Sequence, residues 1–440
     1  MHDHGHGSRP FDVHIIGGGL AGCEAAWQVA RRGGSAVIYE MKPKRFSPAH
    51  LSHRLAELVC SNSLKSTCME NASGLLKAEM RLMGSLVVEA AEAASVPAGA
   101  SLAVDRALFS SYVTDALAGV GVNVIRDEIT RIPDARPLII ATGPLTSDAF
   151  AASISAFIGA ERLYFYDAVA PIVTAASIDM SRAFMASRYG KGEADYLNCP
   201  MTEPEYQRFY DALIVADTVS RRSFEEERSF QACMPIEAMA QKGPKTLLFG
   251  PMRPVGLKDP ATGKRPFAVV QLRKENASAT LYNIVGFQTR MTYNDQKEVF
   301  RLIPALAEAE FVRLGKLHRN TYIDSPRLLL RTGQLRKDQS VFFAGQITGV
   351  EGYCESAMSG LYAGINALRL SKGEPLVTPP DGAISGALLK HISDEANADF
   401  QPMNANMGLL GVNGRKTDKA GLALNALKIM KAWLDSLDNN

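Results

Sequence analysis

The chain has 440 residues, of which 46% are hydrophobic and 21% are charged. This composition excludes a disordered or fibrous protein, and the length suffices for more than one structural unit. The 48 Lys and Arg residues nearly balance the 46 Asp and Glu residues, which leaves a net charge of +2. Because electrostatic steering needs a clear excess of one sign, the overall charge does not indicate a nucleic-acid partner, and any basic surface must be local.

The cysteines and the start of the chain narrow the class of protein further. The cysteines form no C-x-x-C pair, so they indicate neither a zinc site nor a disulfide framework, and we expect no metal site. Residues 1–10 are polar and His-rich, as in a flexible arm, and no apolar run is long enough for a membrane span. We therefore expect a soluble, cytoplasmic protein without a membrane partner. The cysteines are Cys23, Cys60, Cys68, Cys199, Cys233 and Cys354.

The chain begins with a predicted strand, followed in order by a glycine turn, a helix and a second strand. VHII at 13–16 predicts a short buried strand, and the glycine-rich turn GGGLAG follows it directly. A helix is expected next, with a C-cap at Gly33, and AVIYE at 36–40 predicts a strand that ends at Glu40. Together these elements make a βαβ unit, which is typical of the start of a nucleotide-binding domain.

The middle of the chain has a different pattern from both ends. Residues 43–77 lack clear periodicity, so we expect a long irregular loop that contributes to a site, and 74–94 predict one long helix. Aromatic-rich strands then fill 151–320, before a strand, glycine turn and helix return at Val341. Short strands are also expected at 122–128 and 137–143, and a last helix at about 420–437.

The return of the first pattern predicts a split domain. We expect an α/β protein whose Rossmann domain, residues 11–150 and 321–440, is interrupted by a smaller α+β domain of residues 151–320. The inserted domain is expected to hold the substrate.

The glycine turn carries a dinucleotide fingerprint. Gly17, Gly19 and Gly22 fit G-x-G-x-x-G, which allows a tight turn, close approach of the backbone to a pyrophosphate, and close packing of helix on strand. Glu40 follows Gly22 by 18 residues, where a carboxylate can accept both ribose hydroxyls of an adenosine. We therefore predict cofactor binding by these residues together with Gly18, Leu20 and Ala21.

Two further glycine turns favour FAD over NAD. ATG at 141–143 and AGQITGVEG at 344–352 resemble turns that lie near the dinucleotide and the isoalloxazine in flavoproteins of the glutathione-reductase type, and a simple NAD dehydrogenase needs neither turn. We therefore predict a glutathione-reductase-type FAD-binding Rossmann domain. The additional expected cofactor residues are Ala141, Thr142, Gly143, Gly345, Gln346, Gly349 and Val350.

Two cysteines lie in sequences that draw attention to them. Cys60 lies in LAELVCSNSLKS, a polar irregular stretch, and Cys233 lies in FQACMPIE, just before a proline. A nucleophilic thiol needs a cation, a helix N-terminus or a base beside it, and sequence alone does not show that environment.

Beyond these motifs, the chain resembles the TrmFO family, the folate- and FAD-dependent tRNA uracil-5-methyltransferases. The resemblance rests on long strings in one order across about residues 11–412. It does not extend to the N-terminal arm or to the segment after Gly414. The strings include IIGGGLAGCEAAW, AELVCSNSLKS, VPAGASLAVDR, KGEADYLNCPMTE, CMPIEAMA, LLFGPMRPVGL, GKRPFAVVQLR, FFAGQITGVEGYCESAMSGL and FQPMNAN.

The resemblance implies a reaction and roles for particular residues. It implies transfer of the methylene carbon of methylenetetrahydrofolate to C5 of the T-loop uridine of tRNA, with FAD as the reductant and NADPH or NADH recharging it. Cys233 is then the nucleophile that adds to C6, and Cys60 lies near the flavin as the base at C5. Cys199 matches a third family cysteine without an agreed role, Arg290 and Tyr353 line the folate site, and no obligate protein partner is implied.

A tRNA partner requires local cations and aromatic rings. The candidate phosphate contacts fall in three clusters, and the candidate stacking rings fall on the strands of the inserted domain. The cations are Arg221, Arg222, Arg331, Arg336, Lys337, Arg415, Lys416 and Lys419; the rings are Tyr164, Phe165, Tyr166, Tyr282 and Phe287.

Three alternatives stay open at this point, and a fourth is disfavoured. The chain could be an FAD-dependent enzyme that modifies the wobble uridine of tRNA, it could perform the same methylation on ribosomal RNA, or it could bind tRNA without catalysis. A disulfide reductase is disfavoured because it needs a C-x₄-C or C-x₂-C pair.

Overall fold

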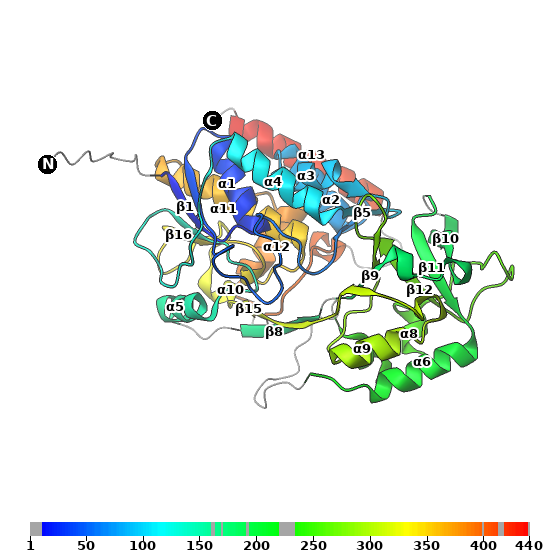
Figure 1. Cartoon of the computed structure of the whole chain (residues 1–440). Coiled ribbons are helices and arrows are strands. Elements are labelled where there is room, and N and C mark those ends of the chain that lie inside the picture. The colour runs from blue at the N-terminus through cyan, green and yellow to red at the C-terminus, as the bar shows by residue number, and fades with distance from the viewer. Residues whose placement is uncertain are drawn as a thin grey trace.

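The structure is a computed structural model, and it describes residues 11–159, 163–168, 170–190, 193–219, 234–397, 400–411 and 418–438. A central sheet of five parallel strands lies in the order β16, β7, β1, β2, β6 (Figure 1). The strands are β1 (Val13–Ile16), β2 (Ala36–Tyr39), β6 (Asn123–Ile125), β7 (Leu138–Ile140) and β16 (Val341–Phe343). They consist largely of buried β-branched and aliphatic residues, as expected for a parallel sheet covered on both faces.

Two helices pack unusually closely beside this sheet, α1 (Leu20–Ala30) and α11 (Tyr353–Ser371). A Cβ added at Gly360 would lie 2.1 Å from the Ala21 carbonyl oxygen, and one at Gly364 would lie 2.5 Å from that of Ala25. The two glycines therefore let the backbones of α1 and α11 touch, which joins the first and last parts of the chain in one core.

The expected single helix over 74–94 is wrong. The structure has α2 (Ala72–Leu82) and α3 (Leu86–Ala93), separated by Gly84 at φ +65°. Ser85 begins the second helix, because its hydroxyl accepts a hydrogen bond from the backbone N–H of Val88. The Arg31 guanidinium fills the space beside Gly84 that a side chain would need, so the break is fixed by a tertiary contact as well as by local sequence.

Buried carboxylates hold the starts of two helices. Glu24 accepts hydrogen bonds from the Ser85 hydroxyl at 2.7 Å and from the N–H of Val87 at 2.9 Å, and so satisfies the first turn of α3. Glu79 does the same for α12 (Ile384–Ser393), accepting from the N–H groups of Ile384 at 2.7 Å and Ser385 at 3.0 Å. Each carboxylate therefore ties two helices that are distant in sequence.

Glu79 makes the stability of the folded protein depend on pH, and its raised pKa sets the direction of that dependence. Burial raises its pKa from 4.5 to about 7, so the folded protein holds this proton more tightly than the unfolded chain does. The resulting stabilisation is complete below about pH 4.5 and is lost as the pH rises through about 7. We expect Glu79→Gln to reduce the fall in Tm between about pH 5 and pH 8, measured by thermal unfolding. The exposed Glu70→Gln is the matched control, and an unchanged slope in Glu79→Gln would contradict the assignment.

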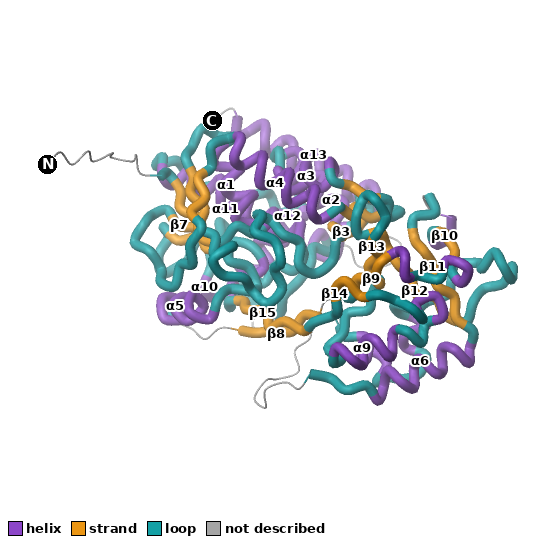
Figure 2. Tube along the Cα trace, in the orientation of Figure 1, coloured by secondary structure: helices purple, strands orange, loops and turns teal. Residues whose placement is uncertain are grey.

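A second sheet lies in the other part of the molecule, with six antiparallel strands in the order β10, β11, β12, β13, β9, β14. Figure 2 shows the strands of the two sheets as separate groups. The strands are β9 (Ile172–Thr174), β10 (Phe184–Ala186), β11 (Tyr196–Met201), β12 (Ala268–Lys274), β13 (Leu281–Ile284) and β14 (Phe311–Arg313). Four helices belong to this part, α6 (Glu203–Val215), α7 (Ile236–Ala240), α8 (Thr246–Phe249) and α9 (Tyr293–Phe300).

Aromatic rings form the core of this second part. The ring of Phe287 lies between those of Phe209 and Phe300, with centroid distances of 6.1 and 5.6 Å. Tyr282 is 5% exposed and Phe287 is fully buried, so neither is available to stack on a base. The side chains of Tyr164, Phe165 and Tyr166, the other expected stacking rings, lie outside the described residues.

The parallel sheet is completed only after the antiparallel one, which confirms a Rossmann unit with an insertion. Helix α5 (Asp148–Ile158) packs Phe150, Ile154 and Ile158 against β7 and β16, so it belongs to the first core. The boundaries at residues 150 and 320 stay predictions. The remaining elements are β3 (Ser63–Ser66), β4 (Ser95–Val96), β5 (Ser101–Val104), α4 (Arg106–Gly119), β8 (Leu163–Ala168), β15 (Leu317–Tyr322), α10 (Ser325–Leu328) and α13 (Lys419–Asp438). Among the described helices, none has the length and apolar character needed to cross a bilayer.

Candidate functional site

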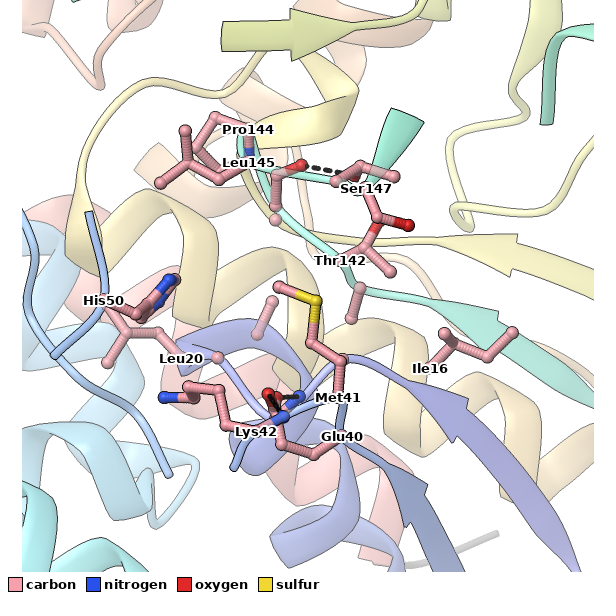
Figure 3. A pocket seen from close by; sticks show the side chains of 18 of the residues that line it. Ile16, Leu20, Glu40, Met41, Lys42, His50, Thr142, Pro144, Leu145 and Ser147 are labelled. Carbon is pink, nitrogen blue, oxygen red and sulfur yellow. Dashed lines mark hydrogen bonds between the residues drawn. The ribbon is translucent and has the colours of Figure 1, made fainter. Parts of the chain in front are cut away.

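A deep cleft lies at the carboxyl ends of the parallel strands, where ligands bind in open α/β sheets. It contains about 1020 Å³ of empty space, part of it open to solvent. Figure 3 shows Glu40, Met41 and Lys42 on one side of it and Thr142, Pro144, Leu145 and Ser147 on the other. Most of the expected cofactor residues line this cleft: Gly17, Gly18, Gly19, Leu20, Ala21, Glu40, Ala141, Thr142, Gly143, Gly345 and Gln346.

The glycine turn admits no side chains at two of its fingerprint positions. Gly17 has φ +106°, and a Cβ there would lie 2.5 Å from the Ala141 carbonyl oxygen. Gly22 does not line the cleft, but its Cβ would lie 1.9 Å from the carbonyl oxygen of Gly17. At Gly19 a Cβ would meet nothing within 4 Å, so this backbone is open to a ligand. Gly22 therefore acts by packing helix on strand, and Gly19 by leaving space.

The fit of the cleft to an adenine dinucleotide rests on Glu40 and on the start of α1. One Glu40 oxygen accepts the N–H of Gly18 at 2.7 Å, and the other accepts the N–H of Lys42 at 2.9 Å. These two bonds hold the carboxylate at the end of β2, and each oxygen keeps a further lone pair for a ribose hydroxyl. Gly19 begins α1 without a side-chain cap, so the first N–H groups of that helix remain for a pyrophosphate.

The third glycine turn lies only partly on the cleft wall. Gly345 lies on the cleft wall, and its N–H donates to the Ser359 hydroxyl at 2.7 Å. Gly349 and Val350 do not line the cleft. A Cβ at Gly349 would lie 2.4 Å from the Phe400 ring, and Val350 is fully buried. These two positions therefore shape the packing behind the turn.

Several other residues on the cleft wall have no recognisable motif in the sequence. The Lys42 ammonium is 3% exposed, donates to the Arg54 carbonyl at 2.8 Å and lies 3.5 Å from a Glu57 carboxylate oxygen. His50 and Thr146 also line the cleft. They come from irregular segments, where periodicity gives no information about which side chains face a ligand.

Tyr353 connects this cleft to the segment that carries Cys60. Tyr353 lines the cleft, and its hydroxyl oxygen accepts the N–H groups of Cys60 at 2.9 Å and Ser61 at 3.1 Å. Burial, together with Cys60, raises the pKa of the Tyr353 phenol, so the hydroxyl keeps its own proton at neutral pH. Cys60 itself is partly exposed. The expected base and the expected cofactor cleft are thus joined through one side chain.

Arginines hold the carbonyl side of the same segment. Arg106 donates to the carbonyl oxygens of Leu58 and Cys60, and Arg313 donates to that of Val59 at 2.8 Å. The backbone of this irregular segment is therefore satisfied by side chains and not by a helix or a sheet. Because Arg106 lies on α4 and Arg313 on β14, both parts of the molecule fix the position of Cys60.

Several arginines lie beside this segment. Arg106 pairs directly with the Glu275 carboxylate, and Arg273 and Arg313 act on the same carboxylate. Burial raises the pKa of Glu275, while Arg106 and Arg273 oppose that shift. Arg106 and Arg313 therefore bring positive charge to the Cys60 segment in a largely buried setting, where charge interactions are strong.

Removal of the Tyr353 hydroxyl tests its link to Cys60. We expect Tyr353→Phe to leave the N–H groups of Cys60 and Ser61 without their acceptor, and so to loosen the segment. The rate of alkylation of Cys60, followed by peptide mass spectrometry, is expected to change several-fold. Tyr112→Phe is the control, because that exposed hydroxyl donates to Glu89 on the far helix α3. Equal alkylation rates in both variants and the wild type would refute the link.

Cys233 lies outside the described residues, and so do the Arg221 and Arg222 pair. The described residues before and after Cys233 both hydrogen-bond to the segment 288–290. The backbone N–H of Val219 donates to the Arg290 carbonyl at 2.9 Å, and that of Ile236 donates to the Gln288 carbonyl at 2.8 Å. Glu237 accepts the Arg290 N–H at 2.9 Å and lies 3.6 Å from its guanidinium. Arg290, expected to line a folate site, is thus held by Glu237 and does not line the cleft.

The other cysteines have environments that differ from that of Cys60. Cys23 and Cys199 are fully buried, and burial raises the pKa of both thiols, to about 12 for Cys199. Burial likewise raises the pKa of Cys354 to about 11, and Cys68 is exposed. Cys23 donates to the Gly18 carbonyl at 3.3 Å, so this buried thiol packs α1 against the glycine turn.

The described basic residues proposed for phosphate contact are mostly engaged within the protein. Arg331 pairs with Asp381, Arg336 pairs with Glu395 at 2.8 Å, and Lys337 donates to the Phe157 carbonyl at 3.2 Å. These contacts favour a structural role for that cluster. Lys419 is exposed at the start of α13, whereas Arg415 and Lys416 lie outside the described residues.

The sheet order, the glycine turn and Glu40 define a dinucleotide-binding protein of the Rossmann type. Residues 12–375 match the family described as "GIDA: Glucose inhibited division protein A". A solved structure of Aquifex aeolicus GidA in its form II crystal shares the fold, with a TM-score of 0.71 at 16% identity, over 96% of this chain and 73% of that one.

Two relatives are much more similar in sequence. A protein of Moorella thermoacetica named "Methylenetetrahydrofolate--tRNA-(uracil-5-)-methyltransferase TrmFO" is 58% identical over 423 residues, which cover 95% of this chain and 97% of the relative. A protein of the same name from Bacillus pumilus is 57% identical over 399 residues, 90% of this chain and 92% of the relative. The chain belongs to the TrmFO branch of the GidA family, which confirms the resemblance found in the sequence.

Proposed function

We propose that the chain is a folate- and FAD-dependent methyltransferase that converts the T-loop uridine of tRNA to 5-methyluridine. The observation that carries the proposal is the direct contact between the cleft wall and the Cys60 segment through Tyr353. Relatives 54–59% identical over at least 90% of the chain bear the name of this activity. The cofactor, the substrate and the reactive thiols would thus meet at one place.

FAD is the cofactor that the cleft fits. The first glycine turn and α1 would hold the pyrophosphate, Glu40 would accept the ribose hydroxyls, and the turns at 141–143 and Gly345 would lie along the flavin half. When bound and reduced, FAD supplies the electrons that turn a transferred methylene group into a methyl group. NADPH or NADH is the proposed source of these electrons.

The protein's own residues would activate the pyrimidine. Cys233 is the proposed nucleophile: its thiolate adds to C6, and the electron pair of the C5–C6 bond then makes C5 able to attack the methylene carbon of methylenetetrahydrofolate. Cys60 would remove the C5 proton, and the electron pair of that C–H bond would expel tetrahydrofolate by breaking the bond between the transferred carbon and the folate nitrogen. Once that carbon has been reduced to a methyl group, the bond between sulfur and C6 would break and return the Cys233 thiolate. Arg106 and Arg313 would stabilise negative charge that develops on the ring, because both guanidinium groups contact the backbone of the Cys60 segment.

A transfer assay tests the function. The chain is incubated with FAD, NADPH, a tRNA transcript and methylenetetrahydrofolate labelled in the methylene carbon, and the labelled nucleoside is identified by mass spectrometry. We expect label in 5-methyluridine at the T-loop position. Label arriving from S-adenosylmethionine, or no label from folate, would contradict the proposal. Parallel reactions with ribosomal RNA, and mapping of any wobble-uridine product, distinguish the alternative substrates.

A further inference from the structure

A concentration of positive charge lies on the surface of the antiparallel part, in the segment 242–265 between α7 and β12. This segment contains six cations and one carboxylate, Asp259, and so carries a net charge of +5, although the whole chain carries only +2. All six cations are exposed, and none forms an ion pair with a carboxylate in the part of the chain that the structure describes. They are Lys242, Lys245, Arg253, Lys258, Lys264 and Arg265.

Two large exposed rings belong to this segment or contact it: Phe249 lies within it, and Tyr189 contacts its Arg253 and Gly256. Phe249, the last residue of α8, is 83% exposed, and Tyr189 is 58% exposed. Water-exposed rings of this size gain nothing from the protein core, but they can stack on unpaired bases. Together the six cations, Phe249 and Tyr189 form what we call the basic face.

The backbone conformation at Tyr189 shows that part of this face is held in a set arrangement. Tyr189 has φ +60°, a conformation that side chains of this size rarely adopt. Its N–H donates to the Gly256 carbonyl at 2.9 Å, and its hydroxyl accepts from the Arg253 guanidinium at 3.1 Å. Arg188 adds a bond to the Val255 carbonyl at 3.0 Å. An exposed ring and an exposed guanidinium are thus positioned together before any ligand arrives.

Strand β12 fixes how far the basic face lies from the cleft. The strand begins at Ala268, three residues after Arg265, and ends at Lys274, whose carbonyl accepts the Asn62 side-chain amide at 2.9 Å. The six steps of about 3.3 Å between its seven residues span roughly 20 Å, so the Arg265 end of the face lies at about that distance from the Cys60 segment. A base drawn out of an RNA loop into the cleft leaves the phosphates of the neighbouring stem at a comparable distance.

We propose that the basic face binds the RNA substrate, with its cations on backbone phosphates and with Phe249 and Tyr189 on unpaired bases. This inference rests on the proposed function and deepens it by assigning a surface to the RNA. Charge complementarity selects the partner: phosphates occur in every nucleotide, and the segment offers six cations against the single carboxylate of Asp259. Exposed rings in the same stretch fit unpaired bases, which a protein or lipid partner does not supply.

Binding of a fluorescent tRNA transcript, measured by anisotropy at several salt concentrations, tests the inference. We expect Lys258→Gln with Lys264→Gln to weaken binding about tenfold and to make the slope of log affinity against log salt less steep by about 2, near 0.9 per phosphate contact. Phe249→Ala is expected to weaken binding by about tenfold without changing the slope, because stacking releases no counterions. The matched control is Lys428→Gln with Lys431→Gln, two exposed lysines on α13.

Each outcome has a defined meaning, provided that circular dichroism and Tm show every variant to be folded. Unchanged affinity and slope in the basic-face variants, or an equal loss in the α13 control, would overturn the inference. So would a wild-type chain that binds no tRNA. The assay needs neither folate nor NADPH, so failure of the two claims can be told apart: RNA binding through the basic face without methyl transfer refutes only the function, whereas methyl transfer with unaffected variants refutes only the face.

Discussion

The variant Gly22→Ala is expected to lose FAD, with an affinity at least about 100-fold weaker than that of the wild type. The added Cβ would lie 1.9 Å from the carbonyl oxygen of Gly17, which is backbone and cannot rotate away. Helix α1 must then move off β1, at a cost of about 1–3 kcal/mol of stability, and its first N–H groups leave the position for the pyrophosphate. Fluorescence titration with FAD and thermal unfolding measure the two effects.

Two further variants make this prediction specific. Gly119→Ala, at the end of α4, adds a Cβ that meets nothing within 4 Å and is expected to retain both FAD and stability. Gly19→Ala also meets nothing within the protein, but its methyl group occupies space facing the cleft. It is expected to fold with a Tm like that of the wild type and to bind FAD more weakly. Wild-type FAD affinity in Gly22→Ala would show that the glycine turn does not position the cofactor.

The variant Cys60→Ala is expected to lose at least about 99% of methyl transfer, because general bases commonly contribute 100-fold or more. It should keep FAD, since Cys60 does not line the cleft itself, although its neighbour Val59 and its backbone partner Tyr353 do. A covalent adduct with RNA containing 5-fluorouridine should still form, because Cys233 is the proposed nucleophile for that bond. The measurements are labelled methyl transfer, flavin absorbance and gel mobility of the adduct.

The same assay applied to two other cysteines separates the roles. Cys233→Ala is expected to lose both the adduct and the methyl transfer. Cys68→Ala is the matched control, because that thiol is exposed and has no proposed role, and it should behave as the wild type does. If Cys60→Ala methylates normally, or if Cys233→Ala still forms the adduct, the assignment of base and nucleophile is wrong.

The first elements of the chain could be predicted because residues close together in the sequence determine them. The strand at 13–16, the glycine turn and the strand that ends before Glu40 all follow from spacing over fewer than 30 residues. The helix break at Gly84 was missed because an Ala- and Leu-rich run suggests continuity, while the cap by Ser85 and the contact with Arg31 appear only in three dimensions. Gly360 and Gly364 gave no signal, since their role depends on which helix they face.

In the candidate site too, features set by nearby residues could be predicted from the sequence, whereas contacts between distant residues could not. Glu40 could be predicted because a carboxylate at the end of the second strand has one geometric role in this fold. Gly349 and Val350 lie in a motif that suggested cofactor contact, yet the packing of Phe400 and the burial of Val350 place both behind the wall. The bond between Tyr353 and Cys60 joins residues 293 positions apart, and no periodicity connects positions at that distance.

The most direct measurement of the central claim is a visible absorption spectrum of the purified chain during titration with FAD. The cleft beside Cys60 predicts a yellow protein that binds one FAD per chain, with the bands of an enclosed flavin, and it predicts that Gly22→Ala stays colourless under the same conditions. A wild-type chain that stays colourless after reconstitution, or that gains colour no more readily than Gly22→Ala, would contradict the assignment of this cleft to a flavin.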